Sequence, residues 1–129
     1  MRELLIGDVF RAAANGRPGH VAVALGERRY TYAELDRAAN RHAHVLRGLG
    51  VGLQDRVVMW SNTDIEAVPL FAALAKLGAV FAPANALLGV DEATEMIGMA
   101  RPSALVVDDA HAADGEVVSA RVGVPLLRL

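Results

Sequence analysis

Polar side chains follow three apolar runs that predict buried strands, each at the point where the strand ends. These side chains are Asn62, Asn85 and Asp108. The carboxyl ends of parallel strands meet at one edge of a sheet, and open α/β sheets bind their ligands at that edge. The pattern therefore makes these three residues candidates for lining a cleft.

The same residues also fit structural roles, which are the commoner ones. Asn62 can cap the helix that follows it, and Asn85 suits a turn after Pro83. Adjacent Asp108 and Asp109 could hold magnesium or a phosphate, but capping of the next helix explains them as well. We favour the structural roles, and we assign no catalytic, cofactor-binding or metal-ligating residue in the chain.

The spacing of three glycines, Gly48, Gly50 and Gly52, superficially resembles that of a phosphate-binding loop. Such loops follow a strand and open a helix, so that backbone amides and the positive helix end meet the anion. These glycines instead follow a predicted helix and precede a strand. The pattern therefore indicates a helix C-cap and a turn.

The histidines and the single lysine do not form a recognisable site. His42 lies on the apolar stripe of a predicted helix, where a buried, hydrogen-bonded role is the commoner one. His42 and His44 are two residues apart and so point to different sides of the helix, which excludes shared metal ligation. His20 and His111 have no recognisable partners, and Lys76 is interpreted as a partner for the C-terminal dipole of its helix.

Charge and composition exclude several classes of function. The formal net charge is −2, there is no cysteine, and no basic and aromatic residues alternate as a nucleic-acid surface requires. A cluster near the predicted hairpin, formed by Arg11, Arg17, Arg28 and Arg29, could touch an acidic membrane surface, although a solvated face is the simpler interpretation. We expect a cytoplasmic protein, since the start is no signal peptide and no run reaches membrane-spanning length.

The stretch that must position the candidate residues is the strand, helix, strand unit from Arg56 to Asn85. Its helix, from Ile65 to Leu77, is apolar on nearly every side, and Gly78 ends it. Pro69 is expected inside that helix, where it would remove a hydrogen bond and produce a kink. Two parallel strands joined by a crossover helix predict an α/β fold with a doubly wound, mostly parallel sheet and flanking helices.

The remaining segments complete the predicted organisation. Residues 1–20 form a docking helix capped by Asp8, residues 21–31 a small amino-terminal β-hairpin, and residues 32–129 the α/β unit. Thr31 and Glu34 form a capping box at the start of a long helix. Later segments are a helix from Asp91 to Ala100, a strand from Ser103 to Val107, a weaker helix over 110–120 and a strand-like run over 124–129.

The last run, VPLLRL, is apolar and would leave an unpaired strand edge. Hydrophobic residues make up 53% of the sequence, which is rich for a free-standing domain of 129 residues. We therefore expect the chain to be a fragment of a larger domain. Self-association through this edge is the alternative way to cover it.

Many residues between Asp8 and Val107 together resemble the amino-terminal part of adenylate-forming acyl-CoA synthetases, most closely fatty-acid CoA ligases of bacterial type. They are Thr31, Tyr32, Glu34, Leu35, Asn40, Arg41, Ala43, Leu46, Gly50, Val51, Asp55, Arg56, Val57, Asn62, Lys76, Leu77, Gly78, Ala79, Val80, Pro83 and Asn85. The chain departs from the family at Gln54, where glycine commonly precedes Asp55, and at Ala84 and Ala86 to Leu88 after Pro83.

The resemblance implies a parent enzyme that uses ATP, magnesium, a carboxylic acid and coenzyme A. Such an enzyme forms an acyl-adenylate and then a thioester. The family's catalytic motifs come later than Leu129, so no catalytic residue carries over and the 129 residues alone should be inactive. Two alternatives stay open: an adenylation domain that loads a carrier protein, and a free-standing interaction module without chemistry.

Overall fold

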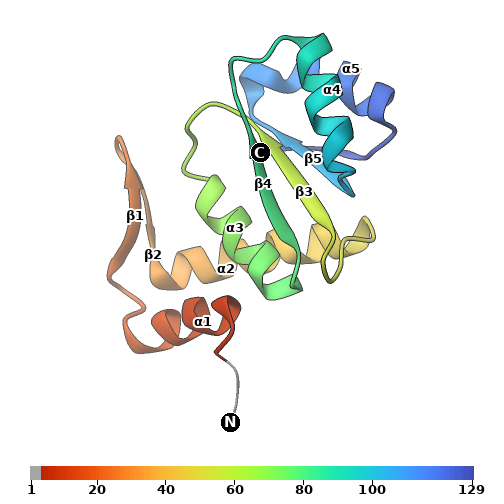
Figure 1. Ribbon diagram of the computed structural model, residues 1–129. Coiled ribbons are helices and arrows are strands. Elements are labelled where there is room, and N and C mark those ends of the chain that lie inside the picture. Colours follow the sequence, from red (N-terminus) through yellow and green to blue (C-terminus); the bar gives the residue numbers. More distant parts are fainter. Residues whose placement is uncertain (1–3) are drawn as a thin grey trace.

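The computed structural model describes residues 4–129 and consists of a parallel sheet with helices on both faces and a separate hairpin (Figure 1). Residues 1–3, which begin the predicted docking segment, lie outside the described residues. The elements, in order, are α1 (Ile6–Gly16), β1 (Val21–Leu25), β2 (Arg28–Thr31), α2 (Tyr32–Gly48), β3 (Arg56–Trp60), α3 (Ala67–Leu77), β4 (Val80–Ala84), α4 (Val90–Ala100), β5 (Ala104–Val107), the 3-10 turn η1 (Asp109–His111), α5 (Ala112–Val122) and β6 (Leu126–Arg128).

The main sheet has the strand order β4-β3-β5-β6, and every neighbouring pair is parallel. The chain moves from β3 to one side to form β4, then crosses back to form β5 and β6 on the other side. Because the crossovers reverse direction at β3, the helices α2 and α3 cover one face while α4 and α5 cover the other (Figure 1). The doubly wound arrangement predicted from the sequence is therefore confirmed.

The core consists of two layers, one on each face of the sheet. Alternate residues of a strand point to opposite faces. Val57 and Met59 of β3 therefore pack beneath α2 and α3, while Val58 and Trp60 pack beneath α4 and α5. In the same layer, Gly115 of α5 lies so close to β5 that an added Cβ would stand 2.9 Å from a methyl carbon of Val107. The central strands are thus fixed from both sides.

The hairpin and the long helix α2 have the predicted boundaries. Strands β1 and β2 pair antiparallel, and the turn between them places Gly26 at a φ of +59°. Both hydrogen bonds of the capping box are present: the amide of Glu34 donates to the Thr31 hydroxyl at 3.2 Å, and the amide of Thr31 donates to the Glu34 carboxylate at 2.8 Å. Local chemistry alone is sufficient to define this helix start.

Helix α3 begins later than its sequence pattern suggested. A turn occupies the residues before Ala67, with the Asp64 side chain accepting from the amide of Glu66 at 2.9 Å. Pro69 is thus the third helical residue, and the first amides of a helix have no intrahelical partner. The predicted loss of an interior hydrogen bond, and the kink derived from it, were wrong. Gly78 does end the helix, at a φ of +69°.

The structure corrects one further prediction on a side-chain role and extends another. Asp8 lies in the first turn of α1 rather than at its cap, since the helix already begins at Ile6. Lys76 lies in the last turn of α3, as its predicted dipole role requires, and its ammonium also contacts the carboxylate of Asp36 and donates to Asn40 at 2.6 Å. The only lysine therefore joins α3 to α2.

The later elements follow the predicted order with small shifts. Helix α4 begins at Val90. The side chain of Met96 was expected on the packed face of this helix, but the residue is 54% exposed. The 3-10 turn η1 precedes α5, and β6 covers only Leu126–Arg128 of the predicted terminal run. Across residues 4–129, no helix has the length and apolar character needed to cross a bilayer.

Candidate functional site

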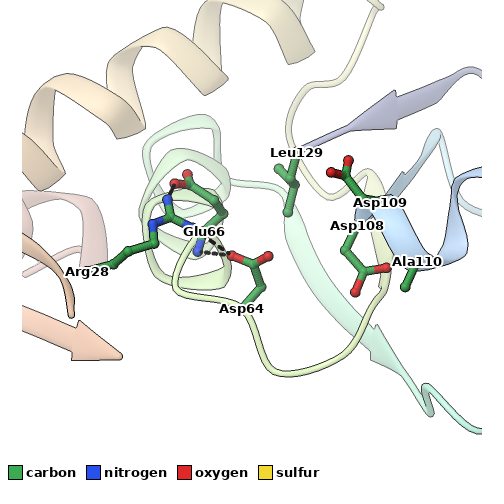
Figure 2. A pocket seen from close by; sticks show the side chains of 7 residues that line it. All are labelled: Arg28, Asp64, Glu66, Asp108, Asp109, Ala110 and Leu129. Atoms are coloured by element: carbon green, nitrogen blue, oxygen red, sulfur yellow. Dashed lines mark hydrogen bonds and ion pairs between the residues drawn. The ribbon is translucent and has the colours of Figure 1, made fainter. Parts of the chain in front are cut away.

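A cleft of about 500 Å³ opens at the carboxyl edge of the sheet, between β5 and the start of α3 (Figure 2). Its lining residues come from four parts of the chain: Arg28 of the hairpin, Asp64 and Glu66 before α3, Asp108, Asp109 and Ala110 after β5, and Leu129. This is the edge at which a doubly wound sheet binds ligands, because the connections that leave the adjacent strands β3 and β5 run in opposite directions. Four of the seven lining side chains are carboxylates.

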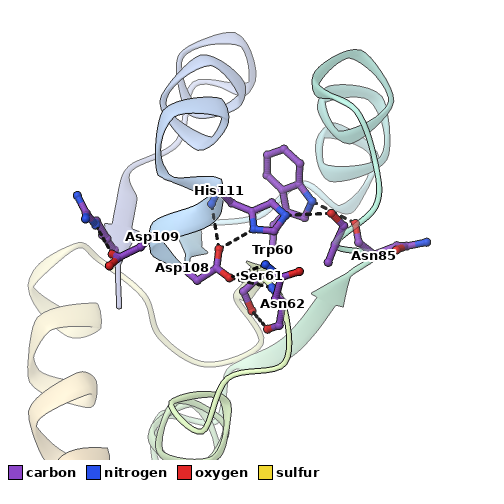
Figure 3. A network of polar contacts seen from close by, with 9 residues as sticks. Trp60, Ser61, Asn62, Asn85, Asp108, Asp109 and His111 are labelled. Carbon is purple, nitrogen blue, oxygen red and sulfur yellow. Dashed lines mark hydrogen bonds and ion pairs between the residues drawn. The ribbon is translucent and has the colours of Figure 1, made fainter.

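Asp108 is the centre of the polar network on one side of the cleft (Figure 3). One of its carboxylate oxygens accepts from the ring nitrogen Nδ1 of His111 at 2.5 Å and from the His111 amide at 3.0 Å. The other accepts from the amide of Asn62 at 2.9 Å and from its side-chain nitrogen at 3.3 Å. The Asp108 carboxylate thereby joins the ends of β3 and β5 and caps η1.

Both ring nitrogens of His111 face acceptor oxygens in this arrangement. Nδ1 faces the Asp108 carboxylate, and Nε2 lies 2.9 Å from the carbonyl oxygen of Ala86, so both partners are acceptors. Burial alone would lower the pKa of His111, but the hydrogen bonds to Ala86 and Asp108 outweigh it and raise that pKa above its ordinary value. The surroundings of the ring therefore favour its protonated form and hold it over the loop after β4.

The pKa of the Asp108 carboxyl shifts in the opposite direction. Burial would raise the pKa of Asp108, but the hydrogen bonds from His111 and Asn62 hold it below its ordinary range. Asp108 and His111 are 9% and 8% exposed, so the ion pair is largely removed from water. A pair this buried holds its two segments in one arrangement, because separating the partners would leave a charge without a partner.

Trp60 completes the network from the last position of β3. Its indole nitrogen donates to the carbonyl oxygen of Asn85 at 3.1 Å, and its ring lies 4.9 Å from that of His111 (Figure 3). The planes of the two rings are tilted by 57° to each other, and the pair packs at the carboxyl edge of the sheet. Asn85 uses its side chain locally, accepting from the amide of Leu87 at 2.9 Å. The ends of β3, β4 and β5 are thus joined to one another.

Glu66 is the centre of a second network, on the hairpin side of the cleft (Figure 2). One carboxylate oxygen accepts from Arg28 at 2.6 Å and from the Tyr30 hydroxyl at 2.6 Å, and the other lies 3.4 Å from Nε2 of His42. Burial would raise the pKa of Glu66, but these donors lower it. Burial and the hydrogen bond to Glu66 raise the pKa of Tyr30 to about 12. This network fixes the hairpin to α2 and α3.

The carboxylates of the cleft are already engaged with donors of the chain itself. Asp108 and Glu66 accept as described above, Asp64 accepts from the Glu66 amide, and Asp109 pairs with Arg128 at 2.6 Å. Within residues 4–129, no three histidine, aspartate or glutamate side chains are grouped so that they could hold a metal ion. The arrangement suits the wall of a cleft, since its charges are fixed and its backbone is held rigidly.

The structure brings the predicted cleft residues together more closely than their spacing required. Asn62 and Asp108 contact each other directly, but Asn62 does not cap α3: both its amide and its side chain donate to Asp108. The turn role of Asn85 and the capping role of Asp108 are confirmed. Asp109 does not cap a helix and lies 75% exposed beside Arg128.

The sequence interpretation missed His111 and Glu66. His111 was described as having no partner, yet it lies three residues after Asp108, a spacing at which a capping carboxylate meets the ring. Glu66 gave no signal, because its donors come from positions 24 to 38 residues away. His42, predicted to be buried and hydrogen-bonded, is 28% exposed and contacts Glu66.

The predicted arginine cluster does not form one free positive face. Arg28 pairs with Glu66, and Arg11 pairs with Asp8 at 3.2 Å. The glycines after α2 form a turn, as expected, with Gly50 at a φ of +89°. The amide of Gly52 in that turn donates to the Asp55 side chain at 2.8 Å.

Comparison with known proteins gives one family and several relatives. The family described as AMP-binding enzyme matches residues 10–126. The long-chain-fatty-acid–CoA ligase FadD13 of Mycobacterium tuberculosis is 38% identical over 88 residues, which are 62% of this chain and 18% of the relative. A protein of Salinispora arenicola named "Probable non-canonical nonribosomal peptide synthetase (NRPS) CymA" is 35% identical over 103 residues, which are 80% of this chain and 1% of that protein.

The fold matches solved structures over nearly its whole length. The N-terminal domain of FACL13 from Mycobacterium tuberculosis superimposes with a TM-score of 0.87 and 28% identity, covering 98% of this chain and 34% of that structure. The chain therefore spans about a third of that solved domain and a much smaller share of the relatives matched by sequence.

Proposed function

Because this chain belongs to the AMP-binding enzyme family, we propose that it forms the amino-terminal part of an ATP-dependent acid–thiol ligase. Among such ligases, the fatty-acid CoA ligase type is the one we infer. The observation that most supports this proposal is the structural match to the N-terminal domain of FACL13, which covers 98% of the chain at a TM-score of 0.87. The 38% identity to a long-chain-fatty-acid–CoA ligase supports the same substrate class.

The proposed reaction has two steps. A carboxylate oxygen of the acid attacks the α-phosphorus of ATP, which forms an acyl-adenylate and releases pyrophosphate. The thiol of coenzyme A then attacks the acyl carbon, AMP leaves with the bonding electrons, and a thioester forms. Both steps transfer a group to or from the adenylate, so the site must exclude water from that intermediate.

In this reaction, we assign a structural role to residues 1–129. The Asp108 and Glu66 networks hold the two sides of the cleft at the carboxyl edge of the sheet. Asn62, Asn85 and Asp108 are proposed to stand at the edge of the parent enzyme's cleft rather than at the reacting atoms. Their contribution is orientation, because their polar atoms are engaged in joining the strand ends.

ATP, magnesium and coenzyme A are proposed for the parent enzyme. The described carboxylates do not suit magnesium, since those of the cleft accept from chain donors and form no three-residue group. We therefore derive no step through a metal in this part of the chain. A phosphate-bound magnesium held by other parts of the parent would be compatible with this proposal.

An exchange assay tests the proposal. Radiolabelled pyrophosphate, ATP and a series of carboxylic acids are incubated with residues 1–129 and, separately, with the protein isolated from its natural source. We expect exchange only with the natural protein, and with fatty acids above aromatic or amino acids. Exchange by residues 1–129 alone would contradict the structural role, and no exchange by either would contradict the ligase proposal.

A second candidate concerns the thiol acceptor. The 35% identity to a protein named as a nonribosomal peptide synthetase favours an adenylation domain that passes its acyl group to a carrier protein. Thioester formation with coenzyme A, compared with a phosphopantetheine-bearing carrier protein, separates the two. Rapid transfer to coenzyme A alone supports the CoA ligase, and transfer only to the carrier supports the second candidate.

A non-catalytic interaction module is the remaining alternative. It requires a native species of 13.6 kDa, whereas the ligase proposal requires a much larger one, so an intact-mass measurement on the natural protein separates them. We also propose self-association through β6, membrane association and a cytoplasmic location. Sedimentation of residues 1–129 at several concentrations tests the first of these.

A further inference from the structure

A second hollow, of about 310 Å³, lies on the surface between the hairpin and helix α2 and has a basic lining. Arg29 and Tyr30 come from β2, and Glu34, Arg37 and Arg41 come from α2. All three arginines are exposed. A volume of this size is at the lower end of small-molecule sites, so it suits a compact ligand.

Sequence spacing and the turn of the hairpin bring these arginines together. Glu34, Arg37 and Arg41 are three and four residues apart, so they lie on one side of α2. The packed side of the same helix presents Leu35, Ala38, Ala39 and Leu46. Arg29 follows Arg28 in β2, and successive strand residues point to opposite faces. Arg28 reaches Glu66 in the cleft, while Arg29 contributes to the hollow.

The positive charge of the hollow is not neutralised from within. Among residues 4–129, no carboxylate forms an ion pair with Arg29, Arg37 or Arg41, although Arg11, Arg28, Arg121 and Arg128 each have one. Glu34 is the only acidic lining residue, and its carboxylate accepts from the Thr31 amide at 2.8 Å. The Tyr30 hydroxyl donates to Glu66 and is therefore engaged. Formally, the hollow carries two more positive than negative charges.

This arrangement costs stability locally. Arg37 and Arg41 are four residues apart on one helix, and like charges at that spacing repel each other. The chain as a whole has a net charge of −2, yet Glu34 is the one carboxylate that lines the hollow beside the three arginines. Repulsion between like charges on one helix is expected where those residues serve to bind a ligand rather than to stabilise the helix.

We propose that the hollow formed by Arg29, Arg37 and Arg41 binds a phosphate group. Guanidinium groups suit phosphate because their planar N–H pairs match two phosphate oxygens at once, and they stay charged at any physiological pH. Three of them line this one small hollow and supply its charge for a phosphate dianion or a pyrophosphate. The phosphate belongs either to a soluble molecule or to a phospholipid headgroup, and the binding chemistry is the same for both.

The site goes beyond the proposed ligase function, since it needs neither the cleft nor the adenylate. Its ligand-binding residues are separate from the Asp108 and Glu66 networks, except that Tyr30 borders both the hollow and Glu66. Failure of this proposal would therefore leave the ligase proposal intact. Likewise, failure of the exchange assay would not affect phosphate binding here.

The test uses residues 1–129 in which Arg37→Gln and Arg41→Gln are combined. The matched control combines Arg17→Gln and Arg47→Gln, which removes the same charge from exposed arginines that do not line the hollow. Pyrophosphate is titrated into the ¹⁵N-labelled wild type and both variants, and amide shifts are followed. In a second arm, sedimentation with vesicles of phosphatidic acid in phosphatidylcholine is compared with sedimentation with phosphatidylcholine alone.

We expect pyrophosphate to shift amides of β2 and the first half of α2, with affinity about tenfold or more weaker in the Arg37/Arg41 variant and unchanged in the control. Sedimentation with phosphatidic acid that follows the same pattern would identify a headgroup as a ligand, and its absence would identify a soluble phosphate. No shift in β2 and α2, together with no sedimentation, would overturn the proposal. Equal weakening in both double variants would also overturn it, because binding would then depend on net charge alone.

Discussion

The two carboxylate networks that border the cleft have the same chemistry but different surroundings. Asp108 lies inside the sheet edge, and the side chains of Asp108 and His111 are 12% and 10% exposed. Glu66 lies between separate elements, and its partner Arg28 has a side chain that is 61% exposed. One network therefore has little water around it, while the other is open to solvent at one side.

This difference predicts what each network stabilises. Asp108 joins strands whose neighbours are already fixed by the core, so losing it affects the whole domain. Glu66 fixes the hairpin, which pairs only with itself and stands beside the main sheet (Figure 1). A loss there is expected to release the hairpin locally before the sheet unfolds.

The largest expected effect is that of Asp108→Ala. It leaves the buried ring of His111 and the amide of Asn62 without their acceptor, and breaking a buried pair in this way costs about 3 kcal/mol or more. Urea unfolding followed by circular dichroism measures the loss. The control is Asp109→Ala, whose side chain is 75% exposed and which should change the free energy of unfolding by less than about 0.5 kcal/mol. Similar losses at both positions would contradict the comparison.

Glu66→Gln is expected to have a smaller and more local effect. It removes the charge shared by Arg28, Tyr30 and His42, but the site is partly solvated, so we expect a loss of about 1 kcal/mol. Hydrogen exchange should show faster exchange of the amides in β1 and β2, with little change in β3 and β5. Glu95→Gln, an exposed change on α4, serves as the control. Equal acceleration in hairpin and sheet would show that the two networks are not separable.

The pH dependence of stability separates the two networks further. The pKa of His111 is raised above 6.5, so its stabilisation is complete below that pH and is lost as pH rises through the folded-state value. The pKa of Asp108 is lowered from 3.8, so its stabilisation is complete above that pH and is lost as pH falls. Unfolding free energies measured from pH 3 to 9 should therefore be highest between these limits.

His111→Gln should abolish the decline on the alkaline side, because it removes the titrating ring that faces Asp108, Asp114 and the Ala86 carbonyl. The decline should persist in His42→Gln, which removes a histidine of the Glu66 network. If the alkaline decline disappears in the His42 variant instead, the decline belongs to the Glu66 network, and the prediction for His111 is contradicted.

The smallest expected effect concerns the basic hollow, where Arg41 has no carboxylate partner within residues 4–129. Arg41→Gln removes its repulsion with Arg37, and we expect a gain of about 0.2–0.5 kcal/mol in unfolding free energy. Arg47→Gln should give a small loss instead, since Arg47 lies in the last turn of α2 and favours the helix dipole. Thermal unfolding at low salt measures both. A loss on replacing Arg41 would mean that this arginine has a stabilising partner.

Much of the fold could be predicted because its signals are local. The capping box at Thr31, the turn at Gly26 and the helix end at Gly78 depend on residues a few positions apart. The start of α3 could not be predicted in the same way. The apolar pattern continues back to Ile65, and only the turn formed by Asp64 places Pro69 in the first helical turn.

The candidate site was predicted in part. Strand ends in a doubly wound sheet meet at one edge, so Asn62, Asn85 and Asp108 were recognisable as neighbours from their positions alone. Their partners were less accessible. His111 is close to Asp108 in sequence, but its second acceptor is the carbonyl of Ala86, 25 residues away. A carbonyl carries no side-chain signal that a sequence could reveal.

The sequence by itself determined the order of elements, the parallel sheet and the family, because periodicity, caps and glycine turns act over short distances. Only the tertiary structure decided which charges are paired. Arg28 and Arg29 are adjacent and identical in type, yet one meets Glu66 and the other lines a hollow with two arginines that form no ion pair within residues 4–129. Pairing depends on which residues the fold brings within a few ångströms, and no local rule contains that information.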